Sequence, residues 1–191
     1  LSRLAQMIAI SGQRIAANID YALSQRNNHS ISEAVGLWTI GLLFPEFTQA
    51  EQWRERGCAL LEQLAPELID PDGAFVQHSV NYHRVMLHDY LWAMRLGALL
   101  HQPLSRSTQE RVATAGRFLY QLQEQATGRV PHYGQMDGAL VLPLNNCDYL
   151  DFRPVIQAIH YLTTGRRCYT SGPWDEDLFW LFGADGLQAP Q

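Results

Sequence analysis

Apolar residues recur at helical spacing along almost the whole chain. In the opening segment Leu4, Ile8, Ile15 and Ile19 lie along one face of a helix, with Met7 beside them. No segment sustains the alternation of apolar and polar residues that is typical of a β-strand. The same helical spacing predicts six further helices, near residues 30–43, 48–64, 79–100, 107–125, 151–164 and 173–182. The pattern therefore predicts an all-α chain.

Capping signals mark the ends of these helices. A Ser or Thr followed three residues later by Glu forms a capping box, which satisfies free backbone N–H groups at a helix start. Gly165 and Gly183 suit the positions after the last two helices, and Pro173 suits a first turn. Three helices are predicted to begin with such boxes: Ser30 with Glu33, Thr48 with Glu51, and Ser107 with Glu110.

The connections predict helical hairpins laid side by side, as an all-α array or part of an (α/α) toroid. Residues 127–149 form a long loop, and loops longer than about 15 residues are uncommon unless they are functional. Six or seven helices are too few to close an (α/α) ring, and the sequence begins with Leu1 rather than Met. We therefore expect residues 1–191 to be a single α-helical domain and a fragment of a larger protein.

Composition excludes several classes of protein. With 191 residues, 47% of them hydrophobic, the chain can bury a core. Its net charge of −5 argues against a protein that is held to nucleic acid by phosphate contacts. No apolar run reaches the length of a membrane span. The three cysteines are far apart and odd in number, so they indicate neither a disulfide framework nor a zinc site.

The first candidate site is the polar run before the second predicted helix. If Ser30 is the N-cap, Asn28 and His29 lie just outside a helix start, beside free N–H groups and the positive end of the helix dipole. An anionic group such as a carboxylate can bind there, because an amide and an imidazole both donate hydrogen bonds. The alternative is that Asn28 forms a plain turn and His29 is a surface residue.

The second candidate is Tyr82, in the first turn of the helix that begins at Ser79. His78, His83 and Arg84 lie close to it in the sequence. Positive neighbours lower the pKa of a tyrosine and make its phenolate accessible as a base. The alternative is an amphipathic core residue with a satisfied hydroxyl. A metal site at His78, His83 and His88 is not expected, because spacings of five residues do not converge on a helix.

A third candidate lies around the long loop. Asp148 and Asp151 could be paired carboxylates for acid–base hydrolysis, or they could simply serve a helix N-terminus. The tryptophans, Trp38 among them, could offer faces on which sugars stack, although most of them fall at core spacing.

Three stretches stand out together: NNHSISEAVGLWTIGLLFPEF, DGAFVQHSVNYHRVMLHDYLWAMRL and GQMDGALVLPL. They resemble the α-helical domain of the heparinase II/III-like polysaccharide lyases, which include heparinases and several alginate lyases. The resemblance runs from roughly residue 20 to residue 182. Its most specific elements are NNH before a helix and SxxYH some fifty residues later.

The resemblance implies an (α/α) toroid followed by a β-sandwich domain, with the substrate between them. It implies β-elimination on a uronic-acid polysaccharide, in which Asn28 and His29 neutralise the carboxylate and Tyr82 transfers the proton. His78, His83, Arg84 and Trp38 are the expected substrate contacts. A further histidine, and a metal that is often bound in the second domain, would lie outside this chain.

Two features depart from this expectation. The chain is acidic, so basic residues must line the cleft of an enzyme that acts on a polyanion. The loop sequence GQMDG is also less acidic than the resemblance implies. The residues expected to supply positive charge are Arg26, Arg84, Arg129 and Arg153.

We therefore predict an all-α lyase fragment that needs no cofactor within the chain. Its partner is an acidic polysaccharide, with no nucleic acid or membrane, and its location is periplasmic or extracellular. Two alternatives stay open: a glycoside hydrolase on a similar toroid, and a helical scaffold that binds glycan or protein without catalysis.

Overall fold

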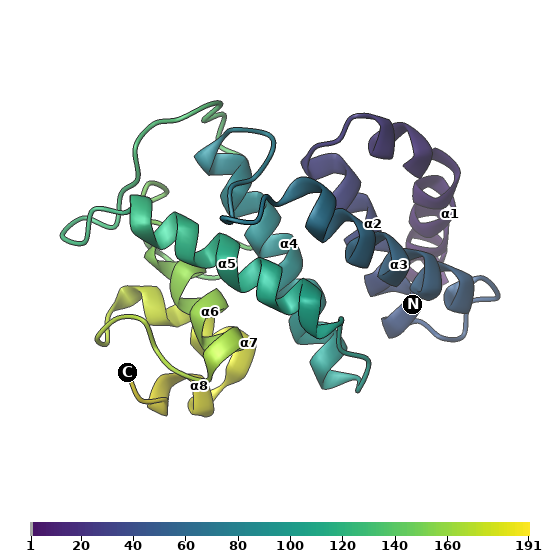
Figure 1. Cartoon of the computed structure of the whole chain (residues 1–191). Helices are drawn as coiled ribbons and strands as arrows, with labels where there is room; N and C mark the ends of the chain where they lie inside the picture. Colours follow the sequence, from purple (N-terminus) through teal and green to yellow (C-terminus); the bar gives the residue numbers. More distant parts are fainter. Residues whose placement is uncertain (1) are drawn as a thin grey trace.

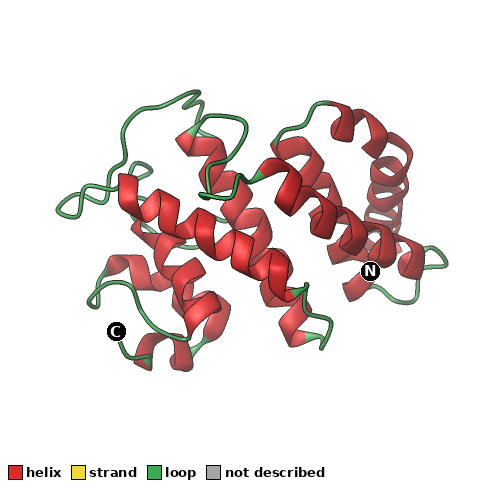
Figure 2. Ribbon diagram, in the orientation of Figure 1, coloured by secondary structure: helices red, strands yellow, loops and turns green. Residues whose placement is uncertain are grey.

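The computed structural model describes residues 2–191, and the regular elements in this part are helices joined by loops (Figures 1 and 2). The only β pairing among these residues is an isolated bridge between Ile69 and Phe75. The all-α prediction is confirmed. The elements are α1 (Ser2–Ser24), α2 (Asn28–Leu43), α3 (Ala50–Leu68), α4 (Val80–Leu99), α5 (Arg106–Leu122), α6 (Arg153–Thr164), the 3-10 helix η1 (Pro173–Asp175), α7 (Glu176–Phe182) and α8 (Ala184–Gln188).

Helix α4 lies at the centre of the molecule. Helices α1 to α3 occupy one side of it and α6 to α8 the other, with α5 packed alongside (Figure 1). Helices α2 and α3 approach each other closely at Gly57. A Cβ added at this glycine would lie 2.5 Å from the backbone nitrogen of Trp38, so a larger residue would push the two helices apart. No helix among residues 2–191 is long and apolar enough to cross a bilayer.

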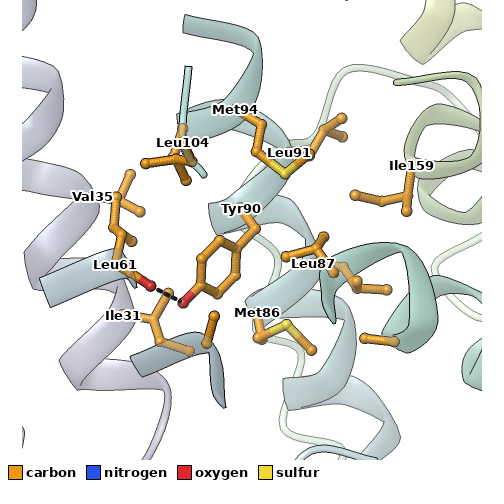
Figure 3. Packing of buried hydrophobic residues seen from close by; sticks show 14 of the residues in the cluster. Ile31, Val35, Leu61, Met86, Leu87, Tyr90, Leu91, Met94, Leu104 and Ile159 are labelled. Atoms are coloured by element: carbon orange, nitrogen blue, oxygen red, sulfur yellow. Dashed lines mark hydrogen bonds between the residues drawn. The ribbon is translucent and has the colours of Figure 1, made fainter. Parts of the chain in front are cut away.

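The core is built around the buried side chains of α4. The Tyr90 ring is fully buried, and its hydroxyl donates a 2.9 Å hydrogen bond to the backbone oxygen of Leu61 (Figure 3). Ile31 and Val35 of α2 lie on one side of this ring, and Ile159 of α6 closes the other side of the cluster (Figure 3). Burial of large apolar side chains contributes about 1.5–3 kcal/mol each, so α4 is firmly held along its length.

The predicted start of α2 is wrong by two residues. The N-cap is Asn27, whose side chain accepts a 3.0 Å hydrogen bond from the backbone N–H of His29. Ser30 is fully buried, and its hydroxyl donates instead to the backbone oxygen of Ala22 at 2.9 Å. Ser30 therefore ties α2 to α1 and does not cap it.

The other two predicted capping boxes are also wrong. Helix α3 begins after Gln49, which makes no side-chain capping bond, so Thr48 is not the N-cap. Helix α5 is capped by Ser105, whose hydroxyl accepts a 3.3 Å hydrogen bond from the backbone N–H of Thr108. Ser107 already lies in the first turn of α5. In both cases the predicted helix exists, but its cap differs and its end moves, to Leu68 in α3 and to Leu122 in α5.

Helix ends near the C-terminus agree with the sequence. Gly165 ends α6 with a φ of 71°, and Gly183 follows α7 with a φ of 67°. The segment predicted as one helix over 173–182 consists of η1 and α7. Helix α8 was not predicted, because five residues are too few to show helical periodicity.

Candidate active site

Two segments far apart in the sequence meet at one end of the helical array. The backbone N–H of Asn28, the first residue of α2, donates a 3.1 Å hydrogen bond to Oε1 of Gln77. Gln77 comes just before Ser79, the N-cap of α4. The two motifs singled out in the sequence therefore lie at the same end of the molecule (Figure 1).

Asn28 and His29 lie in the first turn of α2, not outside it. The expectation that both precede the helix is corrected, because Asn27 rather than Ser30 is the cap. The side chain of Asn28 makes no hydrogen bond within residues 2–191, and its amide oxygen is buried without a partner. His29 is exposed. The amide nitrogen of Asn28 donates no hydrogen bond among residues 2–191, so this nitrogen and the exposed ring of His29 are the groups that can donate to a ligand at the positive end of the helix.

Tyr82 lies in the first turn of α4, as predicted. The hydroxyl of Ser79 accepts a 3.2 Å hydrogen bond from the backbone N–H of Tyr82. The same hydroxyl donates at 2.7 Å to the backbone oxygen of Gln135, and the N–H of Val80 donates at 3.0 Å to Tyr133. The long loop after α5 is thereby docked on the start of α4 (Figure 1).

This loop brings Asp137 to Tyr82. The phenol of Tyr82 donates a hydrogen bond to Oδ2 of Asp137 at 2.5 Å. The amide of Asn81 donates at 3.4 Å to Oδ1 of the same carboxylate. Sequence reasoning did not identify Asp137 as a site residue. Its place in a loop without periodicity gave no signal that it contacts a helix start.

The expected effect on Tyr82 is reversed. The hydrogen bond to Asp137, followed by burial and the charge of Asp137, raises the pKa of Tyr82 above its usual value. The same hydrogen bond holds the pKa of Asp137 below its usual value. The predicted lowering is wrong, because the phenol donates to a carboxylate, whereas the guanidinium of Arg84 is bound to Asn81 and Tyr149. Burial lowers the pKa of His83 to about 4, so its ring is neutral at pH 7.

Arg84 is used inside the protein. Its guanidinium donates at 2.8 Å to Oδ1 of Asn81 and at 2.5 Å to the backbone oxygen of Tyr149. It lies 4.3 Å from the ring centroid of Tyr149 and 4.4 Å from that of Phe152. At 3% exposure it is a core residue. The expectation that Arg84 contacts substrate is therefore not supported.

His83 and Trp38 are also core residues. Nε2 of His83 donates to the backbone oxygen of Ala115 at 2.9 Å, and its ring stacks on Phe118 with centroids 5.5 Å apart. Trp38 is 2% exposed, and its indole N–H donates to the backbone oxygen of Ala93. Neither side chain offers a face on which a sugar could stack.

His78 is exposed, at a left-handed backbone position with a φ of 52°. Its ring lies edge-on to Tyr133, with centroids 6.4 Å apart. Both rings line a cavity of about 480 Å³ between the starts of α4 and the long loop, together with Phe75 and Phe118. Among the four predicted substrate contacts, His78, His83, Arg84 and Trp38, His78 is therefore the one that faces open space.

Asp148 and Asp151 are both engaged in contacts with neighbouring residues. Asp151 binds Arg153 through an ion pair of 2.7 Å, in which both side chains are largely buried. Asp148 accepts a 2.8 Å hydrogen bond from the backbone N–H of Leu150. Both carboxylates thus stabilise the turn before α6, which agrees with the alternative that they serve a helix N-terminus.

Only two of the four arginines that were expected to supply positive charge to a substrate are exposed. Arg84 and Arg153 are engaged as described, whereas Arg26 and Arg129 are exposed. Within residues 2–191 no group of three or more His, Cys, Asp or Glu side chains is arranged to hold a metal ion.

Comparison with known proteins matches this chain to the family described as Heparinase II/III N-terminus, over residues 5–120. A heparin-sulfate lyase from Bacteroides thetaiotaomicron is 36% identical over 78 residues, which is 41% of this chain and 11% of the relative. The crystal structure of heparinase III matches with a TM-score of 0.60 at 21% identity, over 78% of this chain and 23% of the other. The chain thus spans a small part of either relative, and the second likeness shows the fold alone.

Proposed function

This chain belongs to the Heparinase II/III N-terminus family, and from that premise we propose that it supplies catalytic groups of a polysaccharide lyase. The substrate is a polysaccharide that contains uronic acid, of the glycosaminoglycan or alginate type, and the reaction is β-elimination. The likeness to a heparin-sulfate lyase supports this substrate class. Polymers of this kind place the reaction in the periplasm or outside the cell.

Asn28 and His29 bind the uronate carboxylate. The proton next to a carboxylate is too weakly acidic to be lost unaided, since charge accumulates on the carboxylate oxygens as it leaves. Hydrogen bonds that strengthen as this charge develops stabilise the transition state. The amide nitrogen of Asn28, which donates no hydrogen bond among the described residues and lies at the positive end of α2, supports this role.

Tyr82 transfers the proton. In β-elimination the C–H bond next to the carboxylate breaks, its electron pair forms a carbon–carbon double bond, and the glycosidic C–O bond breaks. One proton leaves the sugar and one reaches the departing oxygen, so the sum is balanced within the substrate and the enzyme. Tyr82 first releases its phenol proton to solvent; its phenolate then takes the proton from the sugar, and the phenol so formed returns that proton to the departing oxygen.

One observation carries the proposal: the hydrogen bond from Asn28 to Gln77. It joins the start of α2 to the residues that lead into the cap of Tyr82's helix. Carboxylate binding and proton transfer must occur at neighbouring atoms of one sugar ring, so the two motifs must meet. Asp148 and Asp151 face local partners, and no comparable observation favours the hydrolase.

The experiment is an assay of the product. The chain, by itself and within any longer polypeptide that contains it, is incubated with heparin, heparan sulfate, chondroitin sulfate and alginate. A lyase leaves an unsaturated uronate at the new end, which absorbs ultraviolet light. New reducing ends without this absorbance would identify a hydrolase and overturn the proposal. Binding without any new ends would favour the non-catalytic scaffold.

A further inference from the structure

We propose that Asp137 is a positioning residue for Tyr82, held in place by Asn81 and by the docked loop over residues 131–139. The inference deepens the proposed function and rests on it for the role of Tyr82 in proton transfer. The contact between the two side chains is a finding in its own right. Its consequences for Tyr82 can therefore be measured whether or not the chain is a lyase.

Both carboxylate oxygens of Asp137 have partners. Oδ2 accepts the phenol hydrogen of Tyr82 at 2.5 Å. Oδ1 accepts the backbone N–H of Ala139 at 3.3 Å and the side-chain amide of Asn81 at 3.4 Å. An exposed aspartate in a loop would otherwise sample several rotamers. Here three donors converge on it and fix the direction in which it holds the phenol.

Asn81 is the rigid part of this arrangement. It is fully buried, and its Oδ1 accepts hydrogen bonds from Arg84 at 2.8 Å and from the Tyr149 hydroxyl at 2.6 Å. Two donors at the oxygen dictate the orientation of the amide, so its nitrogen must face Asp137. Arg84 is itself stacked between two aromatic rings. Asp137 is therefore held by a side chain whose own orientation is fixed by buried residues.

The loop has a second, independent anchor. Gly134 has a φ of 71°, and a Cβ added there would lie 2.1 Å from the backbone oxygen of His78 and 2.7 Å from Cα of Ser79. The backbone of the loop thus touches the start of α4 directly. The hydroxyl of Ser79 adds its hydrogen bond to Gln135. This anchor holds the loop that carries Asp137 against the start of Tyr82's helix.

The arrangement has two effects on Tyr82. It fixes the direction of the phenol oxygen, and it favours the protonated phenol, because a neighbouring carboxylate accepts its hydrogen bond and opposes a second negative charge. Asp137 acts through Tyr82 and exchanges no proton with the sugar. Its negative charge also repels a uronate carboxylate, which leaves the start of α2 as the favourable place for that group.

The test is a titration of Tyr82 in Asp137→Asn, which keeps the size of the side chain and one acceptor oxygen while it removes the charge. The phenolate absorbance of each protein is compared with that of the same protein carrying Tyr82→Phe, so that the difference reports Tyr82 alone. Tyr82 is expected to ionise at lower pH in Asp137→Asn than in the unchanged chain. Asp137→Ser should give a shift in the same direction, so the result does not depend on one variant.

Asp148→Asn is the matched control, because Asp148 is an exposed aspartate of the same loop that accepts a backbone N–H and does not contact Tyr82. It should leave the titration of Tyr82 unchanged. An unchanged titration in both Asp137 variants would overturn the proposal. A shift in a chain without lyase activity would support the Asp137–Tyr82 coupling and contradict only the proposed function.

In a preparation with lyase activity, two further measurements distinguish a specific effect on the position of Tyr82 from a nonspecific loss of structure. The limb of the pH profile that belongs to Tyr82 should move to lower pH in Asp137→Asn. The kcat should fall by about tenfold to a hundredfold with little change in KM, as misplacement of a proton-transfer group does. A uniform loss of activity at every pH, without a moved limb, would contradict the assignment.

Discussion

Asn28 and Gln77 are joined by a hydrogen bond of 3.1 Å although 49 positions separate them in the chain. The donor is a backbone N–H at a helix start, a group that has no partner within its own helix. The acceptor belongs to the segment that leads into α4. This bond therefore holds the start of α2, the proposed carboxylate site, against the segment that leads into Tyr82's helix.

Replacing Gln77 tests that relationship. Gln77→Ala should cost about 1 kcal/mol of stability, which is the usual contribution of one hydrogen bond, and should lower kcat/KM because Asn28 is no longer held against the start of α4. Thermal unfolding and initial rates measure the two effects. Gln63→Ala is the control, since Gln63 bonds only to Glu67 on the surface of α3. Equal rates for the two variants would contradict the role of the contact.

The side chain of Asn28 is expected to act mainly in the transition state. Asn28→Leu keeps the approximate size but removes the donor, and should lower kcat by about 10²–10³ with little change in folding. His29→Ala, at the neighbouring exposed position, should have a smaller effect on kcat and a larger one on KM. Steady-state kinetics on the preferred polysaccharide distinguish them. A fully active Asn28→Leu would exclude carboxylate neutralisation by this residue.

Two glycines of the loop give a matched pair of variants. Both have positive φ, 71° at Gly134 and 89° at Gly138, but only at Gly134 would a Cβ meet the backbone of the α4 start. Gly138→Ala should cost on the order of 1 kcal/mol for its backbone conformation. Gly134→Ala should in addition undock the loop, lower activity and increase proteolytic cleavage within residues 131–147. Limited proteolysis is the measurement, and equal cleavage of both variants would contradict the docking.

The buried Asp89 makes stability depend on pH. Burial raises the pKa of Asp89 to about 7, although its carboxylate accepts a 2.6 Å hydrogen bond from Ser32. Because the pKa of Asp89 is higher in the folded state, its contribution to the free energy of unfolding is fully present below the pKa of the unfolded chain. That contribution is lost as pH rises through 7. Asp89→Asn should therefore match the unchanged chain near pH 4 and exceed it by roughly 2–4 kcal/mol above pH 7. Denaturant unfolding across this range measures the gap, and a gap independent of pH would contradict it.

Local patterns predicted the helices and the place of Tyr82, because capping by Ser79 and the apolar spacing of α4 lie within a few residues of each other. The cap of α2 could not be chosen in the same way. Asn27 and Ser30 are both able to cap, and the choice depends on burial of Ser30 against Ala22 of another helix. The predicted substrate contacts of His83 and Trp38 failed for a related reason, since the pattern did not distinguish a buried polar atom from an available one.

Local sequence patterns could not identify Asp137 as a residue of the site. It contacts Tyr82 across 55 positions, from a loop whose path depends on Gly134, Ser79 and the start of α4. The sign of the pKa shift of Tyr82 was missed as a consequence, because His83 and Arg84 are buried and the phenol donates its hydrogen to Asp137 instead. Resemblance to a family indicated the tyrosine and the asparagine but not the carboxylate that holds the tyrosine.

Tyr82→Phe tests the central claim most directly. It removes one hydroxyl, keeps the ring and leaves the capping of α4 by Ser79 intact. In an active preparation, formation of the unsaturated uronate should fall to the background rate while affinity for the polysaccharide and thermal stability stay close to those of the unchanged chain. Unsaturated product formed by Tyr82→Phe at the full rate would contradict the account.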